Sequence, residues 1–232
     1  MQKEYIKIQH IPALLWGKQS DRLYVAVHGD QSNKEDKVIA LLAEEAVKKG
    51  FQVLSFDLPA HGERIGAEPQ NAQIYIEELE QVMVYAKKQA KDIYLFANSI
   101  GAYFSLLAFS DEKLKQTLFL SPILDMGQLF EKMMLWAGVN PDQLQKQQVI
   151  ATPFKTLYWA YYTYVKAHPI VMWDIPTAVL YGTLDNLTDM SVIKDFSSRF
   201  PVDLTIMEDS EHFFHTEKQL AFYQAWLQQM IS

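Results

Sequence analysis

One stretch of the sequence decides the fold, and it consists of residues 97–102, ANSIGA. An apolar run at 93–96, IYLF, precedes it and predicts a short buried strand, while the run YFSLLA at 103–108 predicts a helix. Ser99 therefore lies among small residues on a sharp turn from strand into helix. Only small neighbours fit such a turn, because the serine backbone is strained and strand and helix approach closely. The pattern is typical of an elbow that presents the serine hydroxyl beside the first N–H groups of the helix.

The composition indicates one folded α/β domain. The chain has 232 residues, of which 49% are apolar and 13% aromatic, and this excludes disorder. Its net charge of -7 argues against a nucleic-acid partner. With no cysteine, a disulfide, a thiolate metal site and a cysteine nucleophile are all excluded. The first residues, MQKEY, lack the apolar core of a signal peptide, and no stretch is apolar enough to span a membrane, so we expect a cytoplasmic protein.

Strands and helices are expected to alternate along most of the chain. Helices are indicated after Ser32, which forms a capping-box pattern with Glu35, and from Thr216, which forms one with Gln219. Strands are expected at residues 5–8, 11–16, 23–27, 51–56, 93–96, 117–120, 177–181 and 202–207. Repeated strand–helix units predict an α/β fold with a doubly wound, mostly parallel sheet and right-handed crossovers.

One insertion interrupts this alternation. We expect residues 1–122 and 174–232 to form the α/β core, and residues 123–173 to form a mostly helical cap with no strand in it. Within the insertion, residues 157–165 have the aromatic-rich sequence LYWAYYTYV. These aromatic residues either pack as core or line a pocket for an acyl or aromatic group. The candidate pocket residues are Tyr158, Trp159 and Tyr162.

Polar residues follow five of the expected strands. Ligands bind outside the carboxyl ends of the strands in such sheets, so these residues are expected to meet there. They are Gly29-Asp30, Asp57 to His61, Ser99, Asp185 and His212.

The residue types of this group suggest nucleophilic catalysis. A serine hydroxyl needs an adjacent base, for which His212 is the candidate, and the imidazole needs a carboxylate, for which Asp185 is the candidate. The chain order serine, aspartate, histidine is one of the known orders of such a triad. A tetrahedral intermediate also needs two backbone donors. We expect them to be the N–H of Ile100 and that of Gly29 or Asp30.

Other residues compete for these roles. His215 lies next to the final helix and Asp189 at the expected start of another, so His212 and Asp185 fit the loops after the strands better. A zinc site at His212-x-x-His215 lacks a third ligand at suitable spacing.

Further residues near the strand ends are expected to be structural. Ser121 also follows a strand, but Pro122 denies it a helix N-terminus. We expect His28, His61 and Asp57 to support their loops.

With these motifs, essentially the whole chain resembles the serine hydrolases of the α/β-hydrolase fold, and most closely the small capped esterases and lipases. His28-Gly29 matches the HG oxyanion segment of that family, and DLPAHG at 57–62 is similar to its D-x-P-G-H-G loop. The elbow, the acid turn and the final histidine loop match by position, and the insertion lies where the family carries its cap.

Two departures from the family pattern bear on the site. Ala97 replaces the first glycine of the elbow, and Asp30 stands where many members have an apolar residue. Asp30 would either favour a polar or cationic substrate group or cap the following helix, and we expect the cap.

The resemblance implies a serine hydrolase that cleaves a carboxylic ester of a small acyl substrate, with no metal or organic cofactor. Thioesters and amides are cleaved by the same machinery. Two alternatives stay open: a binding or signalling protein without turnover, and another cofactor-free enzyme of this fold, such as a perhydrolase or a lyase.

Overall fold

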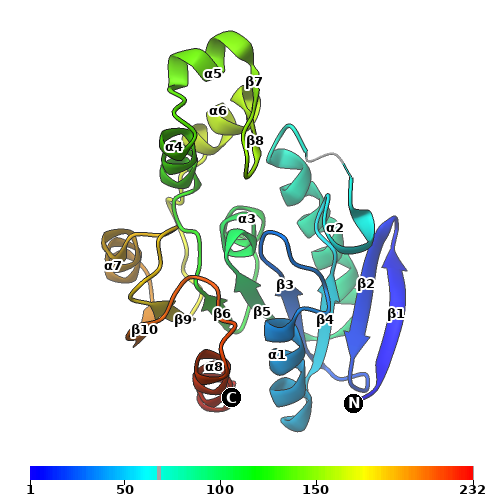
Figure 1. Cartoon of the computed structure of the whole chain (residues 1–232). Coiled ribbons are helices and arrows are strands. Elements are labelled where there is room, and N and C mark those ends of the chain that lie inside the picture. The colour runs from blue at the N-terminus through cyan, green and yellow to red at the C-terminus, as the bar shows by residue number, and fades with distance from the viewer. Residues whose placement is uncertain (67–68, 232) are drawn as a thin grey trace.

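The computed structural model describes residues 1–66 and 69–231, and its central feature is an eight-stranded sheet (Figure 1). In spatial order the strands are β1 (Lys3–Ile8), β2 (Ile11–Trp16), β4 (Gln52–Phe56), β3 (Arg22–Val27), β5 (Asp92–Asn98), β6 (Thr117–Leu120), β9 (Thr177–Gly182) and β10 (Val202–Met207). β2 is antiparallel to β1 and β4, and the remaining neighbours are parallel. The predicted doubly wound, mostly parallel sheet is confirmed.

Helices cover both faces of the sheet because its central strands are apolar on both sides. Along β3, Val25 packs into one buried cluster and the adjacent Ala26 into the other, as the alternation of side chains along a strand requires. The Val25 side carries α2 (Gln73–Gln89), α3 (Ile100–Ala108) and α7 (Met190–Arg199). The Ala26 side carries α1 (Lys37–Lys48) and α8 (Glu217–Met230). A short 3₁₀ turn, η1 (Gly62–Arg64), follows β4.

The helix starts agree with the sequence patterns in one case and not in the other. α8 begins with the predicted capping box of Thr216 and Gln219. The box predicted for α1 is wrong, because Asp36 caps that helix by accepting from the Lys37 N–H at 2.5 Å. Ser32 donates its hydroxyl to the Asp36 carboxylate, and Glu35 is drawn instead to β1, where it binds Lys3 and Tyr5 at 2.8 Å each.

Residues 123–173 are called the cap from here on, and their helices and hairpin lie above α3 in Figure 1. The cap contains α4 (Met126–Trp136), α5 (Pro141–Gln147), β7 (Val149–Ala151), β8 (Thr156–Tyr158) and α6 (Trp159–Ala167). β7 and β8 form an antiparallel hairpin, so the expectation of a cap without strands is wrong. Strands of three residues are too short to show an alternating pattern, and the turn that joins them is closed by Thr152, whose hydroxyl accepts from the Lys155 N–H at 3.1 Å.

The cap has an apolar cluster of its own, formed by Phe130, Met134, Leu144, Leu157 and Tyr162. None of the helices in the described part of the chain combines the length and the apolar character needed to cross a membrane.

Candidate active site

The chain turns sharply at Ser99, between β5 and α3. Ser99 has φ 53° and ψ −122°, a strained conformation for a residue with a side chain. A Cβ added to Gly101 would lie 2.6 Å from the carbonyl oxygen of His28, so only glycine lets α3 approach the end of β3. Ala97, which stands where the resembled family has glycine, is fully buried in β5 two residues before Ser99. The local sequence therefore forms the predicted elbow despite that replacement.

A continuous chain of hydrogen bonds starts at the Ser99 hydroxyl. Its Oγ lies 2.8 Å from Nε2 of His212, and Nδ1 of His212 lies 2.7 Å from Oδ2 of Asp185. Because the Asp185 carboxylate accepts from Nδ1–H, the neutral imidazole has a free lone pair on Nε2 that accepts from the serine hydroxyl. The structure thus brings together the three residues proposed from the sequence, in the geometry of a nucleophile, a base and an orienting acid.

Backbone hydrogen bonds between two loops hold the acid and the base together. The loop after β9 and the loop after β10 are joined where the Leu184 N–H donates to the carbonyl of Ser210 at 2.8 Å. Gly182 makes this approach possible, because an added Cβ would lie 2.3 Å from that same carbonyl oxygen. Asp185 and His212, which are 27 residues apart, meet at this junction.

The Asp185 carboxylate is buried and each of its oxygens has a defined partner. Oδ2 faces His212, while Oδ1 accepts the N–H groups of Leu187 at 2.8 Å and Thr188 at 3.0 Å. The two backbone donors orient the carboxylate, so its direction does not depend on the histidine.

The competing residues lie elsewhere. His215 is exposed and its Nδ1 faces the carbonyl of Phe213 at 2.7 Å. Asp189 directly precedes α7 and forms an ion pair with Lys132 at 2.7 Å. Ser121 is fully buried after β6. Within residues 1–66 and 69–231, no three histidine or carboxylate side chains converge as metal ligands would.

Two backbone segments next to Ser99 offer hydrogen-bond donors. Ile100 is the first residue of α3, and the N–H groups of a first helical turn have no acceptor within the helix. Gly29 lies so close that an added Cβ would be 3.0 Å from the Cβ of Ser99. Ile100 and Gly29 therefore lie beside the nucleophile, and the donor role of the N–H groups of Ile100 and of Gly29 or Asp30 stays a prediction.

His28 supports this loop as a neutral side chain. Its Nδ1–H donates to the carbonyl of Gly29 at 2.7 Å, and its Nε2 accepts from the Leu58 N–H at 3.0 Å. Burial lowers the pKa of His28 to about 4, because the charged form would lose its hydration. The expected structural role agrees with these contacts.

Asp57 holds the loop after β4 together. It accepts from the backbone N–H of Lys34 at 2.8 Å, from the ammonium of the same lysine at 2.8 Å, and from the N–H of Glu63 at 3.0 Å. Gly62 has φ +56°, and an added Cβ would lie 2.3 Å from the Asp57 carboxyl carbon. The DLPAHG loop is thus built around one buried ion pair.

Asp30 does not cap the following helix, because α1 begins seven residues later at Lys37. Its Oδ1 instead lies 3.1 Å from Nε2 of His61 and 2.9 Å from Nζ of Lys155 in the cap. Burial alone would raise the pKa of Asp30, but the hydrogen bond to His61 and the charge of Lys155 outweigh it and hold this pKa well below its ordinary value. The expected capping role is wrong, and the sequence offered no sign of the cap lysine that takes this place.

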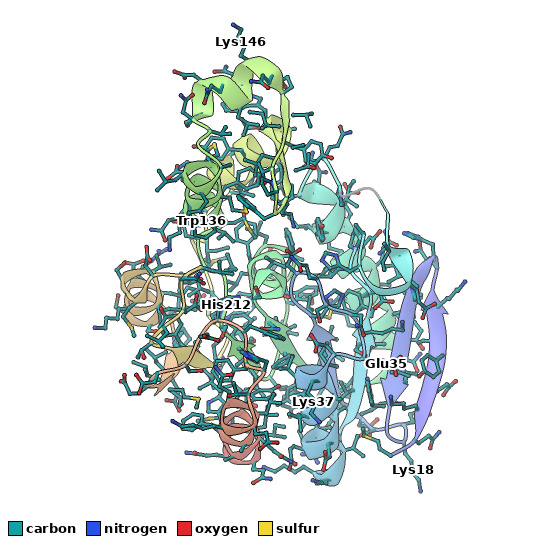
Figure 2. The ribbon with its side chains drawn as sticks, viewed as in Figure 1. Lys18, Glu35, Lys37, Trp136, Lys146 and His212 are labelled. Atoms are coloured by element: carbon teal, nitrogen blue, oxygen red, sulfur yellow. The ribbon has the colours of Figure 1, made fainter. Side chains whose placement is uncertain are left out.

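Two cavities meet at Ser99, and Asp30, Gln31 and Leu187 line both of them. The larger, called the cap cavity, has about 590 Å³ and is walled mainly by apolar side chains, namely Tyr75, Ile100, Met126, Leu129, Phe130, Met133, Trp136, Phe154, Tyr161 and Leu187, beside Lys155. The smaller, called the α1 cavity, has about 430 Å³ and includes polar groups from Gln31, Ser32, Asn33, Asp36, Asn98 and His212. Figure 2 shows Trp136 on the cap and His212 on the loop below it.

The aromatic residues proposed as a pocket are placed differently from the expectation. The rings of Trp159 and Tyr162 contact each other within the cap at a centroid distance of 5.6 Å and a tilt of 49°, and the Tyr162 hydroxyl donates to Glu131 at 3.1 Å. Tyr158 is the last residue of β8. The residue of this aromatic segment that lines the cap cavity is Tyr161. The sequence showed the density of aromatic residues but not the phase of α6, which decides the side chain that faces Ser99.

Nearly the whole chain is similar in structure to known proteins. No family model and no curated relative matches the sequence. Est1E from Butyrivibrio proteoclasticus with bound ferulic acid is similar in structure, with a TM-score of 0.78 and 18% identity over 98% of this chain and 97% of that one. A putative hydrolase from Agrobacterium vitis has a TM-score of 0.80 and 15% identity over 100% and 99%. An esterase from Pyrococcus furiosus has a TM-score of 0.69 and 20% identity over 98% and 87%. These likenesses show that the protein has the α/β-hydrolase fold.

Proposed function

We propose that the protein is a serine hydrolase that cleaves carboxylic esters by acyl transfer. The observation that carries the proposal is the hydrogen-bonded series Ser99, His212 and Asp185, with distances of 2.8 and 2.7 Å, at the junction of the two cavities. A buried aspartate that holds a histidine against a strained serine is the arrangement that activates a hydroxyl. The similarity in fold to two esterases agrees with this proposal.

In the proposed reaction, Oγ of Ser99 attacks the ester carbonyl carbon while Nε2 of His212 takes the hydroxyl proton. The N–H groups of Ile100 and of Gly29 or Asp30 stabilise the resulting oxyanion. When the intermediate collapses, His212 gives the proton to the leaving alkoxide. A water molecule then attacks the acyl-enzyme, again with His212 as base, and the acid and free Ser99 are released. Asp185 stabilises the imidazolium formed in each half-reaction.

The two cavities suggest how an ester would lie. His212 must reach the oxygen of the leaving alcohol, and His212 belongs to the wall of the α1 cavity. Ser99, which would carry the acyl group, lines both cavities, and the cap cavity has the more apolar wall. The alcohol would therefore occupy the α1 cavity and the acyl group the cap cavity.

The walls then suggest the substrate class. A cap cavity of about 590 Å³ with Phe130, Trp136 and Phe154 suits a bulky apolar or aromatic acyl group. The amides and hydroxyls of Gln31, Ser32 and Asn33 suit a polar, hydroxyl-bearing alcohol. Est1E has been seen with ferulic acid, an aromatic acid, in a similar fold. We propose esters of aromatic acids with polar alcohols as the first substrates to assay.

The decisive experiment is the intact mass of the protein after incubation with a small fluorophosphonate. This reagent needs an activated serine but little substrate specificity, so it separates the triad from the choice of substrate. One adduct on the wild type that is absent from Ser99→Ala and His212→Ala would support the proposal. A folded wild type without an adduct would contradict it, and adduct formation with acyl capture but no steady-state hydrolysis would favour the binding protein instead.

A further inference from the structure

The Asp30 carboxylate joins three segments that are distant in the sequence. Asp30 lies in the loop after β3, His61 in the loop after β4, and Lys155 in the turn between β7 and β8 of the cap. Figure 1 shows this hairpin extending from the cap toward the sheet. The ion pair of Asp30 and Lys155, at 2.9 Å, therefore connects the cap to the loop that would hold the oxyanion.

His61 holds the Asp30 carboxylate from the side of the core. Its Nδ1 lies 2.7 Å from the carbonyl of Pro59 and its Nε2 lies 3.1 Å from the Asp30 carboxylate. A carbonyl and a carboxylate are both acceptors, so each ring nitrogen of His61 faces an acceptor and the orientation of the ring is fixed. The carboxylate of Asp30 is thus held between the His61 ring of the core and the Lys155 ammonium of the cap.

The Asp30 carboxylate lies beside the proposed catalytic serine, unlike an ordinary surface ion pair. The proposed second oxyanion donor is either the N–H of Asp30 itself or the N–H of the preceding residue, Gly29. Asp30 and Lys155 also line the cap cavity together with Ser99. Their side chains are 33% and 23% exposed, so water screens the pair only in part.

We propose that Asp30 is a positioning residue whose carboxylate, held between Lys155 and His61, fixes the 29–30 backbone as an oxyanion donor when the cap hairpin is docked. The inference rests on the proposed function, since it assigns a role to a residue beside the same serine. If the hairpin moves away, the cap cavity opens and the carboxylate loses the Lys155 ammonium in the same motion.

A second cap lysine attaches the cap to the core independently of Lys155, so the effect of Lys155 on Asp30 can be distinguished from a general loosening of the cap. Lys132 on α4 forms an ion pair with Asp189 at 2.7 Å and lies 3.3 Å from the carbonyl oxygen of Leu187. This contact connects the cap to the loop after β9. It remains when Lys155 is replaced, so we expect the cap to stay attached while its hairpin is released.

The test compares kcat and KM for a small acetate ester, which does not fill the cap cavity. Lys155→Met removes the cap cation, Asp30→Asn removes the carboxylate, and Lys155→Arg retains the charge. The matched control is Lys166→Met, because Lys166 pairs with Glu131 at 2.8 Å within the cap. We expect kcat to fall about tenfold in the first two variants with KM changed less than about twofold, and both constants to be retained in the last two.

The double variant Asp30→Asn/Lys155→Met tests whether the pair acts as a unit. A loss of about tenfold, equal to either single variant, is expected, while a loss of about a hundredfold would show independent effects and overturn the inference. Wild-type kcat in Lys155→Met, or an equal loss in Lys166→Met, would overturn it as well.

Amide hydrogen exchange supplies a readout that needs no turnover. We expect residues 149–158 to exchange faster in Lys155→Met than in the wild type or Lys166→Met, and equal exchange in all three would overturn the inference. The two proposals fail differently. A wild type without a fluorophosphonate adduct contradicts the hydrolase, whereas a labelled wild type with unchanged Lys155→Met kinetics contradicts only the role of Asp30.

Discussion

Replacement of Asp185 by asparagine exchanges one carboxylate oxygen for an NH₂ group in a site where both oxygens have partners. Oδ1 accepts the N–H groups of Leu187 and Thr188, and Oδ2 faces Nδ1 of His212. The amide oxygen must stay with the two backbone donors, because turning the amide would leave both of them buried against an NH₂ group. Each such donor costs about 1–3 kcal/mol, which makes about 2–6 kcal/mol for the pair.

The amide NH₂ of Asp185→Asn would therefore face His212 and donate to its Nδ1. The imidazole would then carry its hydrogen on Nε2, opposite the Ser99 hydroxyl, and would have no lone pair to accept the serine proton. Loss of the productive tautomer lowers kcat by about 10³- to 10⁴-fold in a triad, which corresponds to about 4–5 kcal/mol of the activation barrier. We expect a loss in this range, with the fold retained because the two side chains have the same shape.

The assay is kcat for an aromatic ester together with the rate of fluorophosphonate labelling. The matched control is Asp189→Asn, which changes a carboxylate on the same loop that contacts Lys132 and not His212. We expect the control to stay within about threefold of the wild type. A kcat for Asp185→Asn within tenfold of the wild type, or an equal loss in Asp189→Asn, would refute the assignment of Asp185 as the orienting acid.

Three further outcomes follow from local geometry. Gly101→Ala places a Cβ 2.6 Å from the carbonyl oxygen of His28 and should lower the free energy of unfolding, measured in urea, by about 2–4 kcal/mol. The control is Gly66→Ala, where the nearest atom to the added Cβ is 3.8 Å away, and it should change this free energy by less than about 1 kcal/mol. The His28 imidazole should titrate near pH 4 in an NMR titration. Because its folded-state pKa lies below its ordinary value of 6.5, the free energy of unfolding should fall as the pH drops from 6.5 to about 4. A titration midpoint near 6.5 would contradict its burial as a neutral ring. Phe154→Ala should raise KM for an aromatic ester about three- to tenfold and leave an acetate ester unchanged, while Tyr158→Phe should affect neither; equal effects on both esters would count against the cap cavity as the acyl site.

Signals that are local in the sequence were sufficient for the sheet and for the elbow. The buried run of β5 followed by small residues predicted the strand, the turn and α3, because each of these is set by neighbours within a few positions. Ile11–Trp16 forms β2 although Pro12 lies in it, since the pairing with β4 begins at Ala13 and needs no proline N–H.

Signals that depend on one or two residues were less informative. Ser32 and Glu35 matched a capping box, but Asp36 caps the helix instead. The Ser32 hydroxyl bonds Asp36, and the Glu35 carboxylate bonds Lys3 of β1. In the cap, β7 and β8 have three residues each, and so short a strand has no period from which it can be predicted.

The sequence by itself determined the eight strands of the main sheet and the placement of Ser99, Asp185 and His212 at strand ends, because the carboxyl ends of parallel strands share one edge of the sheet. Only the tertiary structure decided which side chains meet across that edge. The turn of α6 selects Tyr161 for the cap cavity, and the docked hairpin brings Lys155 to an aspartate 125 residues away. Contacts of this kind depend on helix phase and on the angle of the cap, which no local pattern encodes.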